Sequence, residues 1–126
     1  MSKELKTPIY ISAYGTIKKG YSNNRVVQYP GNSYIGAGIT KEKYAMYRSG
    51  IPFVIKEPLT PIVVDVYEVA SENLPRIDSL EGHPNWYKRE LIPVILEDGK
   101  ELDCWLYFMT RTEVKNYHFV ETGNYQ

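Results

Sequence analysis

The chain has 126 residues and a mass of 14.6 kDa, a length that can bury a core of its own, and we expect a single domain over residues 1–126. Fifteen basic and fifteen acidic residues cancel and the pI is near 6.7, so the charge favours neither a nucleic-acid backbone nor an anionic membrane as partner. Cys104 is the only cysteine, which excludes an internal disulfide, and the sequence shows no signal peptide or membrane span, so we expect a cytoplasmic protein that binds a small molecule or another protein.

The first predicted strand covers residues 8–15, "PIYISAYG", because β-branched and aromatic residues dominate it. Its alternation predicts a core face and an opposite face. The two sets are Ile9, Ile11 and Ala13 for the core face, and Tyr10, Ser12 and Tyr14 for the other. Residues 15–27 have the composition of a loop, and "NNRVVQ", residues 23–28, predicts a short helix that starts from an asparagine cap.

The sequence pattern in the middle of the chain predicts several strands. Residues 33–50 carry glycines inside a strand-like pattern, which indicates bulges or a bent strand at the corner of a small barrel. Residues 51–57 predict a short buried strand, and residues 61–70 alternate as a further strand.

The period changes at residues 71–82, where Leu74, Ile77 and Leu80 are spaced like one face of a helix. Ser71 or Asn73 is the expected N-cap. Pro75 falls in the first turn, where its missing N–H costs little, and "GHP", residues 82–84, is expected to end the helix.

Residues 87–98 and 100–109 flank Asp98-Gly99, a dipeptide typical of a two-residue hairpin turn. The remaining tail, 116–126, is too short for another domain. The order of strands, one internal helix and a hairpin predicts an α+β fold dominated by a curved sheet.

Glu81 is the unusual residue of the predicted helix. It follows Leu74 by seven positions and Ile77 by four, which places it on the apolar stripe. Partial burial and the negative end of the helix dipole would both raise the pKa of its carboxyl toward the range of a general base. The alternatives are that Glu81 turns to solvent at a frayed helix end, or that it forms a carboxylate pair with Asp78.

A second candidate is the turn "YGTIKKG", residues 14–20, where backbone N–H groups around Gly15 could form a nest for an anion. It is not a phosphate-binding P-loop, because Tyr21-Ser22 replaces the required Lys-Ser/Thr pair. The nearby lysines are expected to be solvated. His83, His118 and Cys104 are scattered along the chain, so no metal site is predicted.

Taken in order, five segments resemble the gamma-glutamylcyclotransferase-like family, near its gamma-glutamylamine cyclotransferase branch, over about residues 9 to 109. They are "YGTIKKGYSNNRVV", "GIPFVI", "IVVDVYEV", "LPRIDSLEGHPNWYKRE" and "CWLYF". The YGT-type turn and the D-x-L-E-G-x-P-x-x-Y-x-R segment are specific as a pair. The resemblance implies a small mixed β-barrel with flanking helices, and no metal or cofactor.

The resemblance also assigns roles to residues. It implies that Glu81 is the acid/base, and that the turn after the first strand holds the α-carboxylate of a γ-glutamyl substrate. That turn comprises Tyr14, Gly15, Thr16 and Ile17, with isoleucine where the family usually has leucine. The tail "GNY" resembles a substrate-proximal segment of the family and extends this role to Tyr125.

The implied reaction releases 5-oxoproline and a free amine from a γ-glutamyl amine or γ-glutamyl amino acid. Tyr87 is either an oxyanion donor or a strand aromatic. Arg89, two residues later, is expected to pair with a carboxylate rather than to contact substrate.

Two other functions stay open at this stage. One is a non-catalytic binding module of the same fold for γ-glutamyl or amino-acid-like ligands. The other is a protein-interaction domain that uses its twelve tyrosines as anchors. The sequence specifies neither the leaving amine nor an oligomeric state.

Overall fold

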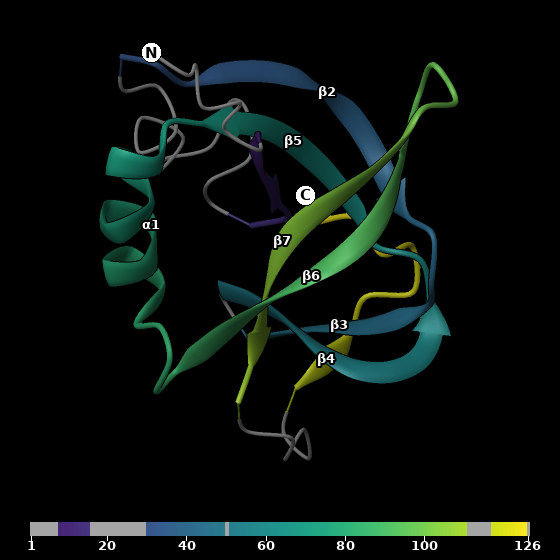
Figure 1. Cartoon of the computed structure of the whole chain (residues 1–126). Coiled ribbons are helices and arrows are strands. Elements are labelled where there is room, and N and C mark those ends of the chain that lie inside the picture. The colour runs from purple at the N-terminus through teal and green to yellow at the C-terminus, as the bar shows by residue number, and fades with distance from the viewer. Residues whose placement is uncertain (1–7, 16–29, 50, 111–116, 126) are drawn as a thin grey trace, which may run out of the picture.

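In the computed structural model, the described residues form a β-barrel with a helix packed against its side (Figure 1). The structure describes residues 8–15, 30–49, 51–110 and 117–125. The strands are β1 (Ile9–Ala13), β2 (Ser33–Thr40), β3 (Tyr44–Ser49), β4 (Ile51–Thr60), β5 (Val63–Val69), β6 (Tyr87–Leu96), β7 (Glu101–Met109) and β8 (His118–Phe119). A 3₁₀ turn η2 (Ser71–Asn73) leads directly into the helix α1 (Leu74–Glu81).

Within these ranges, five strands close a barrel in the order β1-β5-β2-β6-β7. Neighbouring strands are antiparallel except where β1 meets β7 in parallel, with Ile11 opposite Trp105. The remaining strands form a separate sheet in the order β4-β3-β8, which lies at the lower end of the barrel in Figure 1. The prediction of an α+β fold built on a small mixed β-barrel is therefore confirmed.

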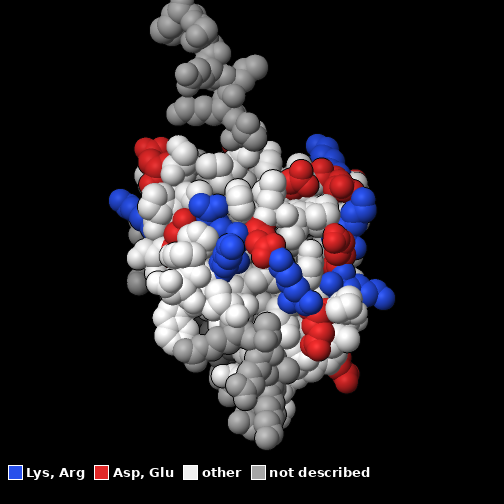
Figure 2. All heavy atoms as spheres, turned by 60° about the horizontal axis from the view of Figure 1, so that its bottom comes forward, with Lys and Arg blue, Asp and Glu red and all other residues white. Residues whose placement is uncertain are grey.

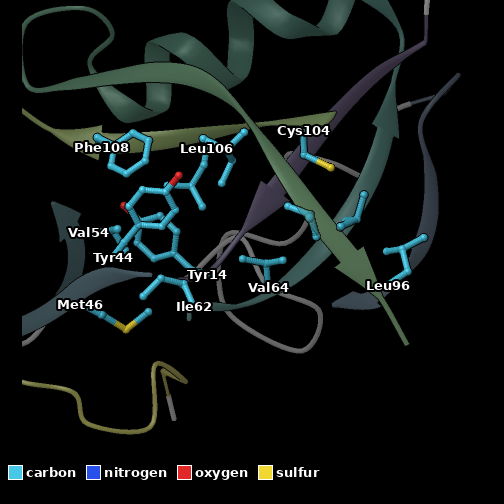
Figure 3. Close-up of a cluster of buried hydrophobic side chains, with 13 residues drawn as sticks. Tyr14, Tyr44, Met46, Val54, Ile62, Val64, Leu96, Cys104, Leu106 and Phe108 are labelled. Atoms are coloured by element: carbon cyan, nitrogen blue, oxygen red, sulfur yellow. The ribbon is translucent and has the colours of Figure 1, made fainter. Parts of the chain in front are cut away.

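One cluster of buried side chains fills the barrel, and we call it the interior cluster (Figure 3). Its members are Tyr14, Tyr44, Met46, Val54, Ile62, Val64, Val66, Ile92, Val94, Leu96, Cys104, Leu106 and Phe108. Alternate residues of β5, β6 and β7 point inward, as the two-residue period of a strand requires. Burial of these apolar groups is the main source of stability for the barrel.

A second cluster lies between α1 and the barrel wall, and we call it the helix-side cluster. Its buried members are Ile11, Ala13, Tyr67, Val69, Ile77 and Tyr107. The core face predicted for the first strand packs here, beneath the helix. The other predicted face is buried too, because Tyr14 belongs to the interior cluster and Ser12 is only 1% exposed. Expecting a single core face for this strand was wrong, since the closed barrel and the helix cover opposite sides of it.

The glycine-containing segment is bent as predicted. The pairing of β2 with β5 shifts its register between Tyr34 and Gly36, which is the irregularity of a β-bulge. The strand predicted over 51–57 is longer than expected and runs to Thr60 in β4. The predicted short helix over 23–28 lies outside the described residues.

The predicted helix is present, and its two ends differ. Gly82 has φ 67°, a left-handed conformation that suits glycine, and its N–H donates to the carbonyls of Asp78 and Ser79. At the other end the predicted side-chain cap is missing. Asn73 occupies the N-cap position, but its amide donates to the Pro30 carbonyl (3.1 Å) and to Asn32 (3.0 Å). The cap prediction was wrong because Asn73 has helical backbone angles, φ −90° and ψ −14°, whereas a side-chain cap needs an extended residue.

The apolar face of α1 is narrower than predicted. Ile77 is fully buried and Leu74 packs partly against the helix-side cluster, but Leu80 is 44% exposed. No helix in the described part of the chain is long and apolar enough to cross a membrane.

The predicted hairpin of β6 and β7 is also present, with a different turn. Ile95 pairs with Glu101, so the connection is longer than two residues. The Gly99 N–H donates to the Leu96 carbonyl (2.9 Å), and Asp98 accepts from the Lys100 N–H. The two-residue turn was a wrong prediction, because Gly99 is the last residue of a four-residue turn that starts at Leu96, instead of lying at the centre of a turn.

Candidate active site

Glu81 is the last residue of α1 and lies one turn beyond the buried Ile77. Its side chain is only partly accessible, because the helix presents this face to the barrel. Burial raises the pKa of the Glu81 carboxyl from 4.5 to about 7. A carboxyl with that pKa can accept and return a proton near neutral pH.

The charge of Glu81 raises the pKa of three tyrosine phenols, so these tyrosines lie near its carboxyl. For all three, burial is the larger cause. They are Tyr14, just after β1, Tyr87, at the start of β6, and Tyr107, on β7. The pKa of Tyr87 is raised to about 12, so its hydroxyl stays protonated at neutral pH and can donate a hydrogen bond. Glu81, Tyr14 and Tyr87, all predicted as site residues from sequence, are thus brought together.

The turn after β1 approaches this group. The Tyr14 hydroxyl donates to the Tyr107 carbonyl (2.7 Å), which fixes the tyrosine inside the barrel end. Gly15 lies against β4, since a Cβ added to it would be 3.2 Å from Cγ of Pro52. Thr16 and Ile17, the other predicted residues of this turn, lie outside the described residues.

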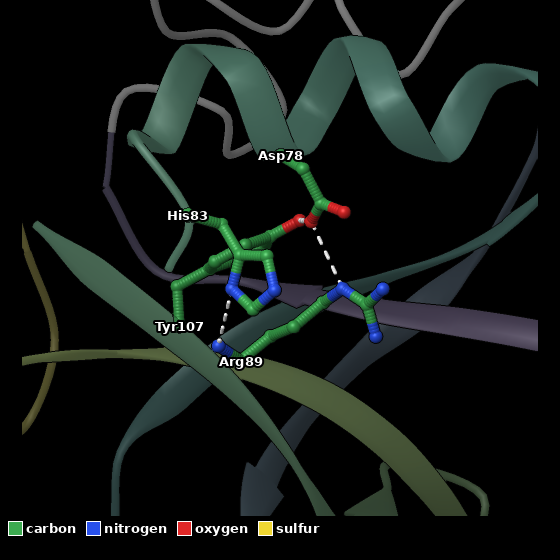
Figure 4. Close-up of polar contacts among 4 residues, drawn as sticks. All are labelled: Asp78, His83, Arg89 and Tyr107. Carbon is green, nitrogen blue, oxygen red and sulfur yellow. Dashed lines mark hydrogen bonds and ion pairs between the residues drawn. The ribbon is translucent and has the colours of Figure 1, made fainter. Parts of the chain in front are cut away.

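Asp78 anchors the helix to the hairpin (Figure 4). Its Oδ1 accepts from Arg89 Nε (2.9 Å) and from the Tyr107 hydroxyl (2.6 Å). Arg89 and Tyr107 are cross-strand partners on β6 and β7, so one carboxylate oxygen ties the helix to both strands. The prediction that Arg89 pairs with a carboxylate is confirmed. The alternative of an Asp78–Glu81 carboxylate pair has no support, because burial alone, without a contribution from Asp78, raises the pKa of Glu81.

His83, two positions after Glu81 in the sequence, makes a further contact with β6. The Arg89 backbone N–H donates to His83 Nδ1 (3.3 Å), and the imidazole packs edge-on to the Tyr107 ring with centroids 6.4 Å apart. Sequence reasoning gave no role to His83 or Tyr107. A correct prediction of the hairpin register would have identified Tyr107, because that register places Tyr107 opposite Arg89.

The C-terminal tail returns to the barrel. Gly123 has φ 68°, and a Cβ there would lie 2.0 Å from the Pro61 carbonyl oxygen, so only glycine fits. Its carbonyl accepts from the Val63 N–H (2.8 Å), which fixes the tail beside β5. Tyr125 packs against the interior cluster, and the Arg48 guanidinium lies 5.1 Å from its ring centroid.

The electrostatics do not suggest a polyanion or a metal as ligand. On the face shown in Figure 2, acidic and basic side chains lie side by side without a patch of one sign. Among the residues that the structure describes, no group of three or more His, Cys, Asp or Glu side chains is arranged to hold a metal ion.

Comparisons with known proteins identify the family of this chain and agree with its fold. The family model described as "Gamma-glutamyl cyclotransferase, AIG2-like" matches residues 11–126. A Methanocaldococcus jannaschii protein named "Putative gamma-glutamylcyclotransferase" is 45% identical over 93% of this chain and 95% of its own. The rat gamma-glutamylaminecyclotransferase is 29% identical over 78% of this chain and 76% of its own. The crystal structure of a mouse AIG2-like protein superposes with a TM-score of 0.83 at 25% identity, covering 96% of this chain and 90% of that chain. This chain belongs to the AIG2-like gamma-glutamyl cyclotransferase family.

Proposed function

We propose that the protein is a cyclotransferase that releases 5-oxoproline and a free amine from a γ-glutamyl amine or γ-glutamyl amino acid, without a cofactor. Family membership and the names of the relatives support the reaction class. The observation that carries the catalytic assignment is Glu81, a partly buried carboxyl at the barrel end with a pKa raised to about 7.

The proposed reaction is an internal acyl transfer. The ionised Glu81 carboxylate takes a proton from the substrate's α-ammonium group, and the freed α-amine attacks the γ-carbonyl carbon to form a tetrahedral intermediate. The attack itself closes the five-membered ring. Collapse of the intermediate re-forms the carbonyl and breaks the bond to the leaving amine, while the ring nitrogen loses its second proton to water to give the lactam. Glu81 returns its proton to that amine, so it ends each cycle ionised. Because nucleophile and carbonyl belong to one molecule, holding the substrate folded supplies much of the rate.

Substrate binding falls to the remaining residues of the candidate site. Backbone N–H groups of the turn formed by Tyr14, Gly15, Thr16 and Ile17 hold the α-carboxylate. The Tyr14 hydroxyl already donates to the Tyr107 carbonyl, so Tyr14 contributes through its backbone. Tyr87, with its protonated phenol next to Glu81, donates to the oxyanion. Tyr125, which packs against the interior cluster that contains Tyr14, is the substrate contact proposed for the tail.

The test is turnover by the purified protein and its Glu81→Gln variant. Each is incubated with γ-glutamyl amines and γ-glutamyl dipeptides, and 5-oxoproline is followed by mass spectrometry. The substitution keeps the size of the side chain and removes the proton acceptor, so we expect the rate to fall about 100- to 10,000-fold. The matched control is Glu101→Gln, the same change at an exposed position on β7, which should keep the parent's rate.

Two results would contradict the proposal. If Glu81→Gln turns over substrate as fast as the parent, Glu81 is not the acid/base. If neither protein releases 5-oxoproline but both bind a γ-glutamyl compound by calorimetry, the chain is a binding module of this fold.

A further inference from the structure

The helix end that carries Glu81 is tied to the hairpin on both sides of that residue. Three positions before it, Asp78 accepts hydrogen bonds from Arg89 and Tyr107. Two positions after it, His83 accepts from the Arg89 backbone. Residues three apart on a helix lie on the same face, so Asp78 and Glu81 both face the barrel. The position of Glu81 is therefore set between two contacts with the same strand, β6.

The side chains that make these contacts are restrained by further interactions and by burial. The Arg89 guanidinium lies 4.4 Å from the Trp105 ring centroid, which restrains it in addition to its ion pair with Asp78. Both side chains of the ion pair are less than one-fifth exposed, so water screens them far less than a surface pair. Tyr107 is 2% exposed and cannot easily turn its hydroxyl elsewhere.

Tyr107 also connects the helix to the turn after β1. Its hydroxyl donates to Asp78 on α1, while its backbone carbonyl accepts from the Tyr14 hydroxyl. One residue of β7 thus contacts both halves of the candidate site: the helix that carries the proton acceptor, and the turn proposed to hold the substrate's α-carboxylate.

We infer that Asp78, Arg89 and Tyr107 act as positioning residues, which set the distance between the Glu81 carboxyl and the Tyr14-Gly15 turn and so align the proton acceptor with the substrate's α-amine. The inference rests on the proposed cyclotransferase function. None of the three residues transfers a proton. They act through Glu81, by preventing the last turn of α1 from tilting away from the barrel end.

Tyr107→Phe is the sharpest test, because it removes one hydroxyl and leaves every charge, the ring and the carbonyl bound by Tyr14. Misplacement of a catalytic group by about 1 Å can cost up to about 100-fold, so we expect kcat to fall roughly 10- to 100-fold while KM changes less than about threefold. The matched control is Tyr34→Phe. It also removes a tyrosine hydroxyl bound to a carboxylate, Asp65 at 3.2 Å, but on the β2–β5 side of the barrel. Its kcat should equal the parent's.

Asp78→Asn is the second variant, since it keeps the size of the side chain and weakens the bonds to both donors. We expect a loss of kcat as large as for Tyr107→Phe or larger. If both variants keep the parent's kcat while their stability falls as much as that of Tyr34→Phe, the network is merely structural and the inference is wrong.

A readout independent of turnover separates this inference from the proposed function. The Glu81 carboxyl carbon is followed by NMR through a pH titration of the parent, Tyr107→Phe and Tyr34→Phe. Loosening the helix end should hydrate Glu81 and lower its titration midpoint in Tyr107→Phe alone. A midpoint unchanged in Tyr107→Phe overturns the inference even if the parent is an active enzyme. If the midpoint is lowered in Tyr107→Phe but the parent turns over no substrate, the positioning role of Tyr107 stands and the proposed cyclotransferase function is rejected.

Discussion

The inside of the barrel and the contact between helix and barrel are held together by different means. The interior cluster is almost wholly apolar, and its side chains are fixed by mutual packing (Figure 3). Beneath α1, apolar burial of Ile77 is combined with the directional contacts of Asp78, Arg89 and Tyr107 (Figure 4). Packing tolerates small shifts, whereas an ion pair and a short hydrogen bond define a distance. The barrel interior therefore provides most of the stability, whereas the contact between α1 and the hairpin fixes the position of the Glu81 carboxyl.

The largest effect on stability should come from the barrel interior. Leu106→Ala removes a fully buried side chain and leaves a cavity, which should lower the free energy of unfolding by about 2–5 kcal/mol in urea titrations. The kcat of the folded fraction should stay within about threefold of the parent, because Leu106 points away from α1. A kcat that falls as far as that of Tyr107→Phe would erase the distinction between the two regions.

Removing the cation from the helix contact should cost less stability and more activity. Arg89→Leu keeps an apolar side chain at this position and leaves Asp78 with the Tyr107 hydroxyl as its side-chain donor among the described residues. We expect a loss of roughly 2–3 kcal/mol, below the range for fully buried pairs because both side chains retain some exposure. Chemical denaturation and kcat are measured on the same preparation. If Arg89→Leu keeps the parent's kcat, the Asp78–Arg89 ion pair is not needed to position Glu81.

Glu81 itself should destabilise the folded state at high pH. Its pKa is about 7 when folded against an ordinary value of 4.5, so between these values the folded protein holds a proton that the unfolded chain releases. The contribution of Glu81 to the free energy of unfolding is therefore greatest below pH 4.5 and is lost as the pH rises through 7. At pH 8, Glu81→Gln should be more stable than the parent by about 2 kcal/mol, a value reduced for partial exposure.

Denaturation of both proteins at pH 5 and pH 8 tests the sign of this effect. The advantage of Glu81→Gln should shrink markedly at pH 5, where the parent's carboxyl is already protonated in the folded state. An advantage of equal size at both pH values would mean that burial does not raise the pKa of Glu81.

The smallest effect should come from an ion pair on the open surface. Lys41 and Glu101 lie 3.0 Å apart with about half of each side chain exposed. Glu101→Gln should change the free energy of unfolding by less than about 1 kcal/mol, and high salt should abolish the difference. A loss equal to that of Arg89→Leu would show that burial does not distinguish the two pairs.

Local patterns predicted most of the fold and one part of the site. The change of period at residue 71 located the helix, and Glu81 stood out because it shares the helix face of Ile77. The contacts of Asp78 could not be predicted in the same way, because they depend on the hairpin register. A two-residue turn at Asp98-Gly99 shifts that register by one residue and places Phe108, not Tyr107, opposite Arg89. Closure of the barrel also buried both faces of β1, which alternation alone cannot reveal.

Cys104 gives the barrel a built-in probe of its own opening. Its thiol is fully buried in the interior cluster, and burial raises its pKa to about 12, so almost no thiolate exists or is accessible in the closed barrel. A thiol reagent can therefore react only with molecules whose strands have separated around β7. Because the chain has one cysteine, the labelling rate measures how often the strands around β7 separate, without a contribution from other thiols. The labelling rate of the unmodified protein thus measures how often its barrel opens locally, with or without substrate bound.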